Sequence, residues 1–134
     1  MKYGRAIVVA SMLSISAVPA LSAESATLKE LMTKVVEPAS NAVFYVGREA
    51  PTTDAQWKAL QIQAAKLKEA AAKLTTSTYA KDKGRWMQDA KLLVDASNAA
   101  VTAANSKKQA ALEELNDPLY TACITCHEHY QPKK

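Results

Sequence analysis

The residues best suited to chemistry in this 134-residue chain form one short motif near its C-terminus. Cys123 and Cys126 are the only two cysteines, and His127 follows directly, so the motif is Cys-x-x-Cys-His. This pattern is typical of covalent attachment of haem c. On a helix, residues three positions apart share a face, so both thiols can form thioethers to one edge of the same haem. The imidazole of His127 can then ligate the iron as an axial ligand.

Three other interpretations of the motif stay open at this point. An exported Cys-x-x-Cys pair can be a redox disulfide, although such motifs usually open a helix beside a β-strand, and the sequence has no strand pattern. A zinc site would add His129 to the motif, but ligands crowded on one turn are poorly placed for a tetrahedron. The third is a chance match on an inert helix. The sequence favours haem over all three.

Several helices must position this motif. The first of them is predicted to begin near Thr27. Thr27 and Glu30 form a capping box, and the segment 47–51 ends the helix. Pro38 lies inside the pattern and should kink the helix. The expected buried face consists of Leu28, Leu31, Met32, Val35, Ala39, Ala42, Val43 and Val46.

Two further helices are predicted before the motif. A capping box at 53–56 opens one, and the other starts near Asp82 or Lys83. The helix that opens at 53–56 has a predicted buried seam of Trp57, Leu60, Ala64, Leu67, Ala71 and Leu74. The helix that starts near Asp82 or Lys83 should bury Trp86, Ala90, Leu93, Ser97, Val101 and Ala104. A break in the helical pattern follows at 105–108.

The fourth helix carries the motif and runs from about 108 to 130. Its expected buried face consists of Leu112, Leu115, Leu119, Cys123, Cys126 and Tyr130. Pro118 either begins a new helix with Asp117 as its cap or kinks a continuous one. Four amphipathic helices with short connections predict an all-α fold, an antiparallel up-down four-helix bundle with covalent haem on the C-terminal helix.

Residues 1–23 have the layout of a secretory signal peptide. Lys2 and Arg5 precede an apolar run of 13 residues from Ala6 to Val18, and Ala23 is the expected cleavage position. The alternative is an uncleaved membrane anchor, for which the apolar run is short. We therefore expect a periplasmic protein whose residues 24–134 form one four-helix-bundle domain, without stable insertion in a membrane.

The distribution of charge argues against binding of nucleic acid. The chain has 17 basic and 13 acidic residues, and 15 basic residues remain once Lys2 and Arg5 are removed with the signal peptide. These charges are mixed along the chain and form no basic stripe. No acid–base pair or nucleophile for a substrate is evident, so we do not expect an enzyme.

The mature chain resembles the class II c-type cytochromes, the family of cytochrome c′ and its low-spin, methionine-ligated relatives. The resemblance rests on a chain of four-helix length, a haem motif near the C-terminus, and Tyr130 three residues after the histidine. It implies a left-handed antiparallel four-helix bundle in which Cys123 and Cys126 hold the haem and His127 is the axial ligand. Relatives often dimerise, so a homodimer is one option.

The same resemblance matches Met32 with the position on the other side of the iron. That position is a methionine ligand in low-spin members and usually a non-ligating bulky residue in cytochrome c′. Two residues depart from the family pattern. Leu28 stands where many members have an arginine, and Gln131 stands where many have a basic residue.

The inventory of side chains also narrows the choice of a sixth iron ligand. His129 is only two positions past the axial histidine, so it points away from the haem face. Two of the four methionines lie in the signal peptide, which leaves Met32 and Met87. Met32 lies on the apolar stripe of its helix, whereas Met87 lies slightly off the buried seam. We expect Met32 to be the ligand, with a five-coordinate iron or Met87 as the alternatives.

These residues predict a periplasmic carrier of single electrons that uses the iron of covalently bound haem c. Its partners would be other redox proteins, which it would contact transiently through the exposed haem edge. If Met32 does not ligate, the alternative is a five-coordinate protein that binds nitric oxide or carbon monoxide. A third option is a structural metal bundle without haem.

Overall fold

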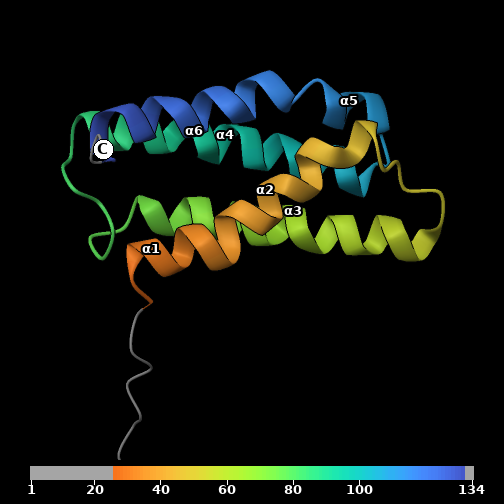
Figure 1. Cartoon of the computed structure of the whole chain (residues 1–134), viewed down its shortest axis with the longest axis horizontal. Helices are drawn as coiled ribbons and strands as arrows, with labels where there is room; N and C mark the ends of the chain where they lie inside the picture. The colour runs from red at the N-terminus through yellow and green to blue at the C-terminus, as the bar shows by residue number, and fades with distance from the viewer. Residues whose placement is uncertain (1–25, 132–134) are drawn as a thin grey trace, which may run out of the picture.

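Within residues 26–131, the part of the chain that the computed structural model describes, every regular element is a helix (Figure 1). The elements are α1 (Leu28–Leu31), the π-helix η1 (Met32–Val36), α2 (Glu37–Phe44), the 3₁₀-helix η2 (Tyr45–Gly47), α3 (Asp54–Leu74), α4 (Arg85–Asn105), α5 (Gln109–Glu113) and α6 (Asn116–Tyr130). They form four long helical stretches, which confirms the all-α class. The predicted signal peptide, residues 1–23, lies outside the described residues.

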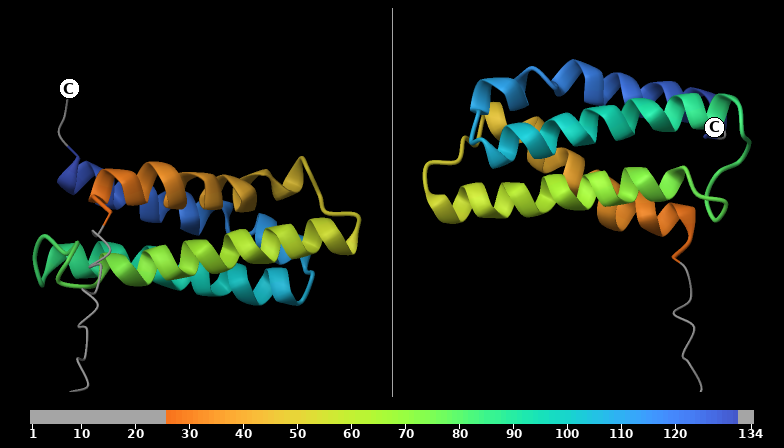
Figure 2. Two further views of the ribbon diagram at one scale, coloured as in Figure 1. Left: turned by 90° about the horizontal axis from the view of Figure 1, so that it is seen from below. Right: turned by 180° about the vertical axis from the view of Figure 1, so that it is seen from behind.

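The long helices pack side by side as a bundle (Figures 1 and 2). α4 packs against both α3 and α6, and α2 packs against α3. Gln61 Nε2 donates to Ala104 O over 3.2 Å, which joins the first half of α3 to the end of α4. At the other end, Trp86 Nε1 donates to Leu74 O over 2.6 Å. None of the helices among residues 26–131 is long and apolar enough to span a bilayer.

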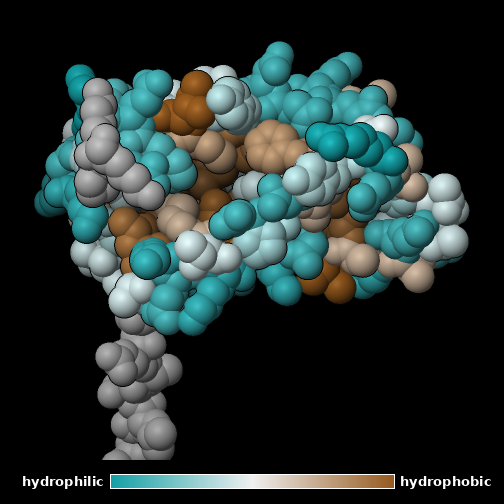
Figure 3. Space-filling view, viewed as in Figure 1, coloured by the Kyte–Doolittle hydropathy of each residue, from teal (hydrophilic) through white to brown (hydrophobic). Residues whose placement is uncertain are grey.

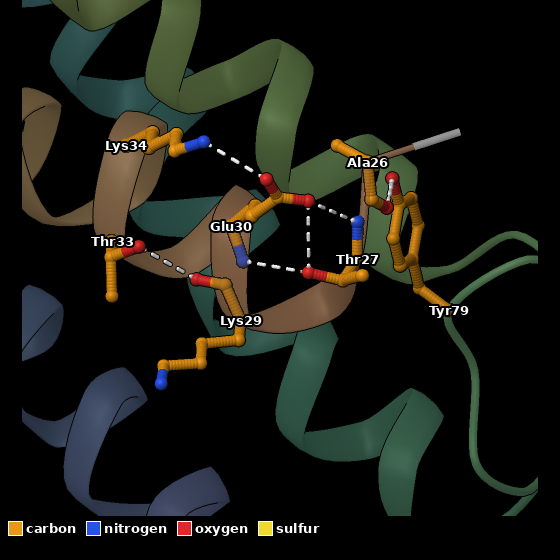
Figure 4. Close-up of polar contacts among 7 residues, drawn as sticks. All are labelled: Ala26, Thr27, Lys29, Glu30, Thr33, Lys34 and Tyr79. Atoms are coloured by element: carbon orange, nitrogen blue, oxygen red, sulfur yellow. Dashed lines mark hydrogen bonds and ion pairs between the residues drawn. The ribbon is translucent and has the colours of Figure 1, made fainter. Parts of the chain in front are cut away.

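The capping box predicted at Thr27 is present (Figure 4). Thr27 Oγ1 accepts a hydrogen bond from Glu30 N over 3.2 Å, and Glu30 Oε2 accepts one from Thr27 N over 3.0 Å. Lys34 Nζ lies 2.9 Å from the other carboxylate oxygen of Glu30. Tyr79 OH donates to Ala26 O over 2.7 Å, so the start of α1 is tied to the loop after α3.

The disturbance expected at Pro38 takes the form of a π-helical turn just before it. In an α-helix, Pro38 would have no N–H to donate to Lys34 O, and its ring would crowd that carbonyl. The chain instead uses wider hydrogen bonds, in which the N–H of Glu37 donates to Met32 O, five residues back. The first helical stretch is therefore continuous, but it contains one wide turn.

The buried residues lie mostly on the predicted faces, but part of these faces is only half-buried. Val36 is buried, whereas Val35, which was predicted to be buried, is only half-buried. Other predicted core residues are also half-buried rather than buried, namely Leu28, Met32, Ala42, Trp57, Val101, Leu115, Cys123, Cys126 and Tyr130. Asp89 is buried although it carries a charge. Small residues outside the predicted seams complete the core, namely Ala70, Ala96, Ala100 and Ala103.

The start of α4 differs from the prediction by two to three residues. The capping box at 53–56 that opens α3 is present as predicted, but α4 begins at Arg85. The reason is that Asp82 acts on the backbone from outside the helix. Its Oδ1 accepts hydrogen bonds from Gly84 N over 2.8 Å and from Trp86 N over 3.1 Å.

The fourth helical stretch is broken rather than continuous. α5 ends at Glu113, α6 begins at Asn116, and Leu115 is the residue at its N-cap. Pro118 lies in the first turn of α6, where its missing N–H costs no helical hydrogen bond. A new helix is therefore confirmed, but the prediction that Asp117 caps it is wrong, because the helix begins before that residue.

Candidate functional site

The Cys-x-x-Cys-His motif lies in the C-terminal half of α6. Leu119 and Ala122, just before it, are buried and pack this side of α6 into the bundle. Cys123 and Cys126 are free thiols, both half-buried, and His127 is exposed. Because the two cysteines are three positions apart on a helix, their side chains lie on the same side of α6. The helix thus presents two adjacent thiols and an accessible imidazole.

The two thiols are in an environment that favours their protonated form. Burial raises the pKa of Cys123. Burial, followed by the negative charges of Asp89 and Cys123, raises the pKa of Cys126 to about 11. A redox-active Cys-x-x-Cys motif needs a cysteine with a lowered pKa. The environment of these thiols therefore argues against the redox-disulfide interpretation.

The residues of the zinc interpretation do not gather at one point. Across residues 26–131, no group of three or more histidine, cysteine, aspartate or glutamate side chains could hold a metal ion. His129 turns toward α4, where its Nδ1 lies 2.7 Å from Asp89 Oδ2. The imidazole of His129 is thus bonded to a carboxylate of a neighbouring helix.

Asp89 is the residue near the motif that sequence reasoning missed. It lies on α4, is 5 % exposed, and is the one charged residue that is buried in the described part of the chain. The sequence does contain a pattern that indicates the burial of Asp89. Asp89 is three residues after Trp86 and four before Leu93, so it lies on the apolar face of α4, where a carboxylate needs a partner.

Met32 lies on a different helical stretch from the motif. It is the first residue of η1, it is half-buried, and it packs against the core. Figures 1 and 2 show α1 at the same end of the bundle as the C-terminal end of α6. η1 packs against α3, and α6 packs mainly against α4. The structure therefore brings Cys123, Cys126 and His127 together on one helix, whereas Met32 lies on another helical stretch.

Apolar side chains lie between the first helical stretch and α6 on the face shown in Figure 3. Partly buried side chains of the first helical stretch and of α6 that pack against the core include Leu28, Met32, Phe44, Cys126 and Tyr130. Two buried polar atoms, Ser40 Oγ on α2 and Asn116 Oδ1 on α6, lack a hydrogen-bond partner within residues 26–131.

These surroundings fit a haem. A porphyrin is a broad apolar group, and a partly open apolar surface beside two thiols suits its edge and faces. Two cysteines, a histidine and a methionine are the side chains by which c-type cytochromes bind haem and its iron. All four side chains are present in the described chain, at Cys123, Cys126, His127 and Met32.

Two grooves lie elsewhere, between the first helical stretch and α3. One of about 420 Å³ is lined by residues that include Leu31, Lys34 and Lys66. The other, of about 490 Å³, is lined by residues that include Tyr45, and Gln63 lines both. Neither groove includes a residue of the motif or Met32, so they are not part of the candidate site.

Comparisons of the chain with protein-family models, with curated proteins and with solved structures find no match. The resemblance to class II c-type cytochromes therefore rests on the sequence alone, namely on the motif, the length of the chain and Tyr130.

Proposed function

We propose that this chain is a periplasmic c-type cytochrome of the class II kind, which carries single electrons through covalently bound haem c. The observation that carries the proposal is the placement of the motif. Cys123 and Cys126 lie on one side of α6, and the exposed His127 follows them, in a fold made only of helices among the residues described. This is the arrangement that attachment of haem to one helix requires.

The proposal includes features that go beyond the helical fold. They are an antiparallel up-down topology, a cleaved signal peptide at 1–23, a mature periplasmic domain at 24–134 without membrane insertion, and redox proteins as partners. Two contacts support the topology, because each joins the start of one helix to the end of its neighbour. Lys107 Nζ, just after α4, lies 2.6 Å from Asp54 Oδ1 at the start of α3, and Asp89 near the start of α4 bonds His129 near the end of α6.

Each residue of the site has a separate role in this proposal. Cys123 and Cys126 bind haem covalently, so that a small bundle does not lose it. His127 and Met32 would be the ligands of the haem iron, and the thioether of Met32 would favour ferrous iron. The bound haem supplies reversible one-electron exchange. The apolar side chains around it exclude water, and no substrate is transformed, so the protein is not proposed to be an enzyme.

One observation favours the second candidate, a five-coordinate protein that binds nitric oxide or carbon monoxide. Met32 is only half-buried, and η1, to which it belongs, packs against α3. If the thioether of Met32 does not reach the iron, the iron keeps an open position that a small gas can occupy. The two candidates share the same attachment site and differ in the sixth ligand.

Haem attachment is tested by expressing the full chain in a host that attaches haem to exported proteins. Denaturing gel electrophoresis with a haem-peroxidase stain then reports covalent haem. We expect the wild type to stain and Cys123→Ala/Cys126→Ala to lose the stain, because no other thiol exists in the chain.

The matched control is Thr125→Ala, since Thr125 lies between the two cysteines and is half-buried like them. This variant should stain like the wild type. An unstained wild type, or a double variant that still stains, would show that the assignment is wrong.

A further inference from the structure

The last two residues of α6 are both bonded to carboxylates near the start of α4. His129 Nδ1 donates to Asp89 Oδ2 over 2.7 Å, and Tyr130 OH donates to Asp82 Oδ2. Figure 1 shows the C-terminal end of α6 lying along α4. Both contacts come directly after the motif, since His129 is two residues past His127. The turn that ends the motif is thus bonded to α4 through Asp89 and to the loop before α4 through Asp82.

Asp89 is the buried member of these contacts. The side chain of Asp89 is 7 % exposed, whereas the side chain of His129 is 31 % exposed. A buried carboxylate is stable only when it is paired and hydrogen-bonded, and loss of its partner is costly. The bond between Asp89 and His129 therefore holds α4 and α6 together more firmly than an exposed pair would.

The last turn of α6 rests against Trp86, which is held firmly in place. Trp86 is 2 % exposed, and its Nε1 donates to Leu74 O at the end of α3. Its ring packs edge-on against Tyr130, with 4.9 Å between ring centroids and 72° between the planes. Because Trp86 is held by both α3 and α6, the last turn of α6 has little room to rotate.

The same carboxylate also lies close to the motif itself. Cys126 and His129 are three residues apart and so share one side of α6. Asp89 is bonded to His129, and its negative charge is also one cause of the raised pKa of Cys126. Since a helical turn moves as one unit, a rotation that released His129 would also move Cys126 and His127.

We infer that Asp89 is a positioning residue, which holds the Cys126–His127 turn of α6 at a fixed rotation through its hydrogen bond to His129. The inference rests on the proposed function, because it concerns the turn that would carry haem. It goes beyond that function by assigning the orientation of the axial imidazole to a residue on another helix. The hydrogen bond itself, and not a change of charge, performs this role.

The first test uses hydrogen exchange in the purified full mature chain. In Asp89→Ala, the backbone amides of residues 127–131 should exchange at least tenfold faster than in the wild type. The control is Asp95→Ala, which removes an exposed carboxylate of α4 that pairs with Lys91. In the control, these amides should exchange at the wild-type rate.

The second test reads the orientation of the ligand in the haem-loaded ferric protein by electron paramagnetic resonance. The g values should shift in Asp89→Ala. They should stay as in the wild type in Asp89→Asn, whose amide oxygen can still accept a hydrogen bond from His129. Leu60→Ala, a truncation of a buried residue on α3, should lower stability without shifting the g values.

The outcomes separate the inference from the proposed function. If the wild type binds no haem, the proposed function fails, and the exchange experiment alone still decides whether Asp89 holds the turn. Unchanged exchange in Asp89→Ala would overturn the inference. Faster exchange spread evenly over all helices, or g values in Asp89→Asn shifted as far as in Asp89→Ala, would also overturn it.

Discussion

Leu31 and Val36 are both buried although they are five residues apart in one helical stretch, at 4 % and 6 % exposure. In an uninterrupted α-helix, Val35 would share the face of Leu31, because residues four apart lie above one another. The wide hydrogen bond from Glu37 N–H to Met32 O adds about one residue to this turn. The π-helical turn thus decides which valine reaches the core.

The first prediction tests this register. Val36→Ala should lower the free energy of unfolding by roughly 2 kcal/mol, because it removes a buried side chain. Val35→Ala should cost less than half as much, since Val35 is only half-buried. Urea denaturation of both variants measures the difference. Equal costs, or a larger cost for Val35→Ala, would mean that the stretch is a regular α-helix.

The second prediction tests the sixth ligand. Met32→Ala should convert a low-spin haem into a high-spin haem that binds carbon monoxide readily, and the far-red methionine–iron charge-transfer band should disappear. The fold should survive, because truncation of a fully buried methionine costs about 2–5 kcal/mol and Met32 is only half-buried. Absorption spectra with and without carbon monoxide report all three changes.

Met87→Ala is the matched control, since Met87 is also half-buried but lies on α4. The Met87→Ala variant should keep the far-red methionine–iron charge-transfer band. A wild type that is already high-spin and takes up carbon monoxide quickly would favour the gas-binding candidate instead.

The third prediction concerns the buried indole of Trp86. Trp86→Phe keeps an aromatic ring but leaves the carbonyl of Leu74 without the donor that lies 2.6 Å from it. A buried polar group without a partner costs about 1–3 kcal/mol, so the variant should unfold at lower urea concentration. Trp57→Phe, at a half-buried position of α3, should shift the midpoint less. Equal shifts would count against this bond.

The fourth prediction concerns pH. Hydrogen bonds from Lys34 and then from Thr27 lower the pKa of Glu30 from 4.5 to about 2. A carboxyl whose pKa is depressed by folding stabilises the fold above its unfolded pKa, and this contribution is lost as pH falls from about 4.5 to about 2. The carbon-13 shift of the Glu30 carboxyl should titrate near 2. In Lys34→Ala the midpoint should rise, and a wild-type midpoint of 4.5 would contradict the prediction.

Local features of this fold could be predicted from the sequence. The capping box between Thr27 and Glu30 joins residues three apart, so its pattern is complete within one turn. The helical position of Cys123 and Cys126 follows equally from the local apolar periodicity. The all-α class was also predictable, because four amphipathic helical patterns indicate it before it is known how the helices meet.

Features that depend on another helix could not be predicted in the same way. The bond between Asp89 and His129 joins residues 40 apart in sequence, and nothing local to either residue specifies the other. The π-helical turn arises because Pro38 prevents an α-helical bond while Leu31 and Val36 are both drawn into the core. The sequence showed the proline but not how the chain would accommodate it.

The two ends of α4 are held by pairs of very different exposure, and this difference makes them respond differently to ionic strength. At one end, the side chains of Lys107 and Asp54 are 48 % and 94 % exposed, so dissolved ions surround the pair. At the other end, the side chains of Asp89 and His129 are 7 % and 31 % exposed, so dissolved ions reach this pair less. At physiological salt, screening acts over about 8 Å, and it weakens exposed pairs far more than buried ones. Concentrated electrolyte should therefore loosen the end of the bundle where α3 begins and leave the end with the Cys-x-x-Cys-His motif closed.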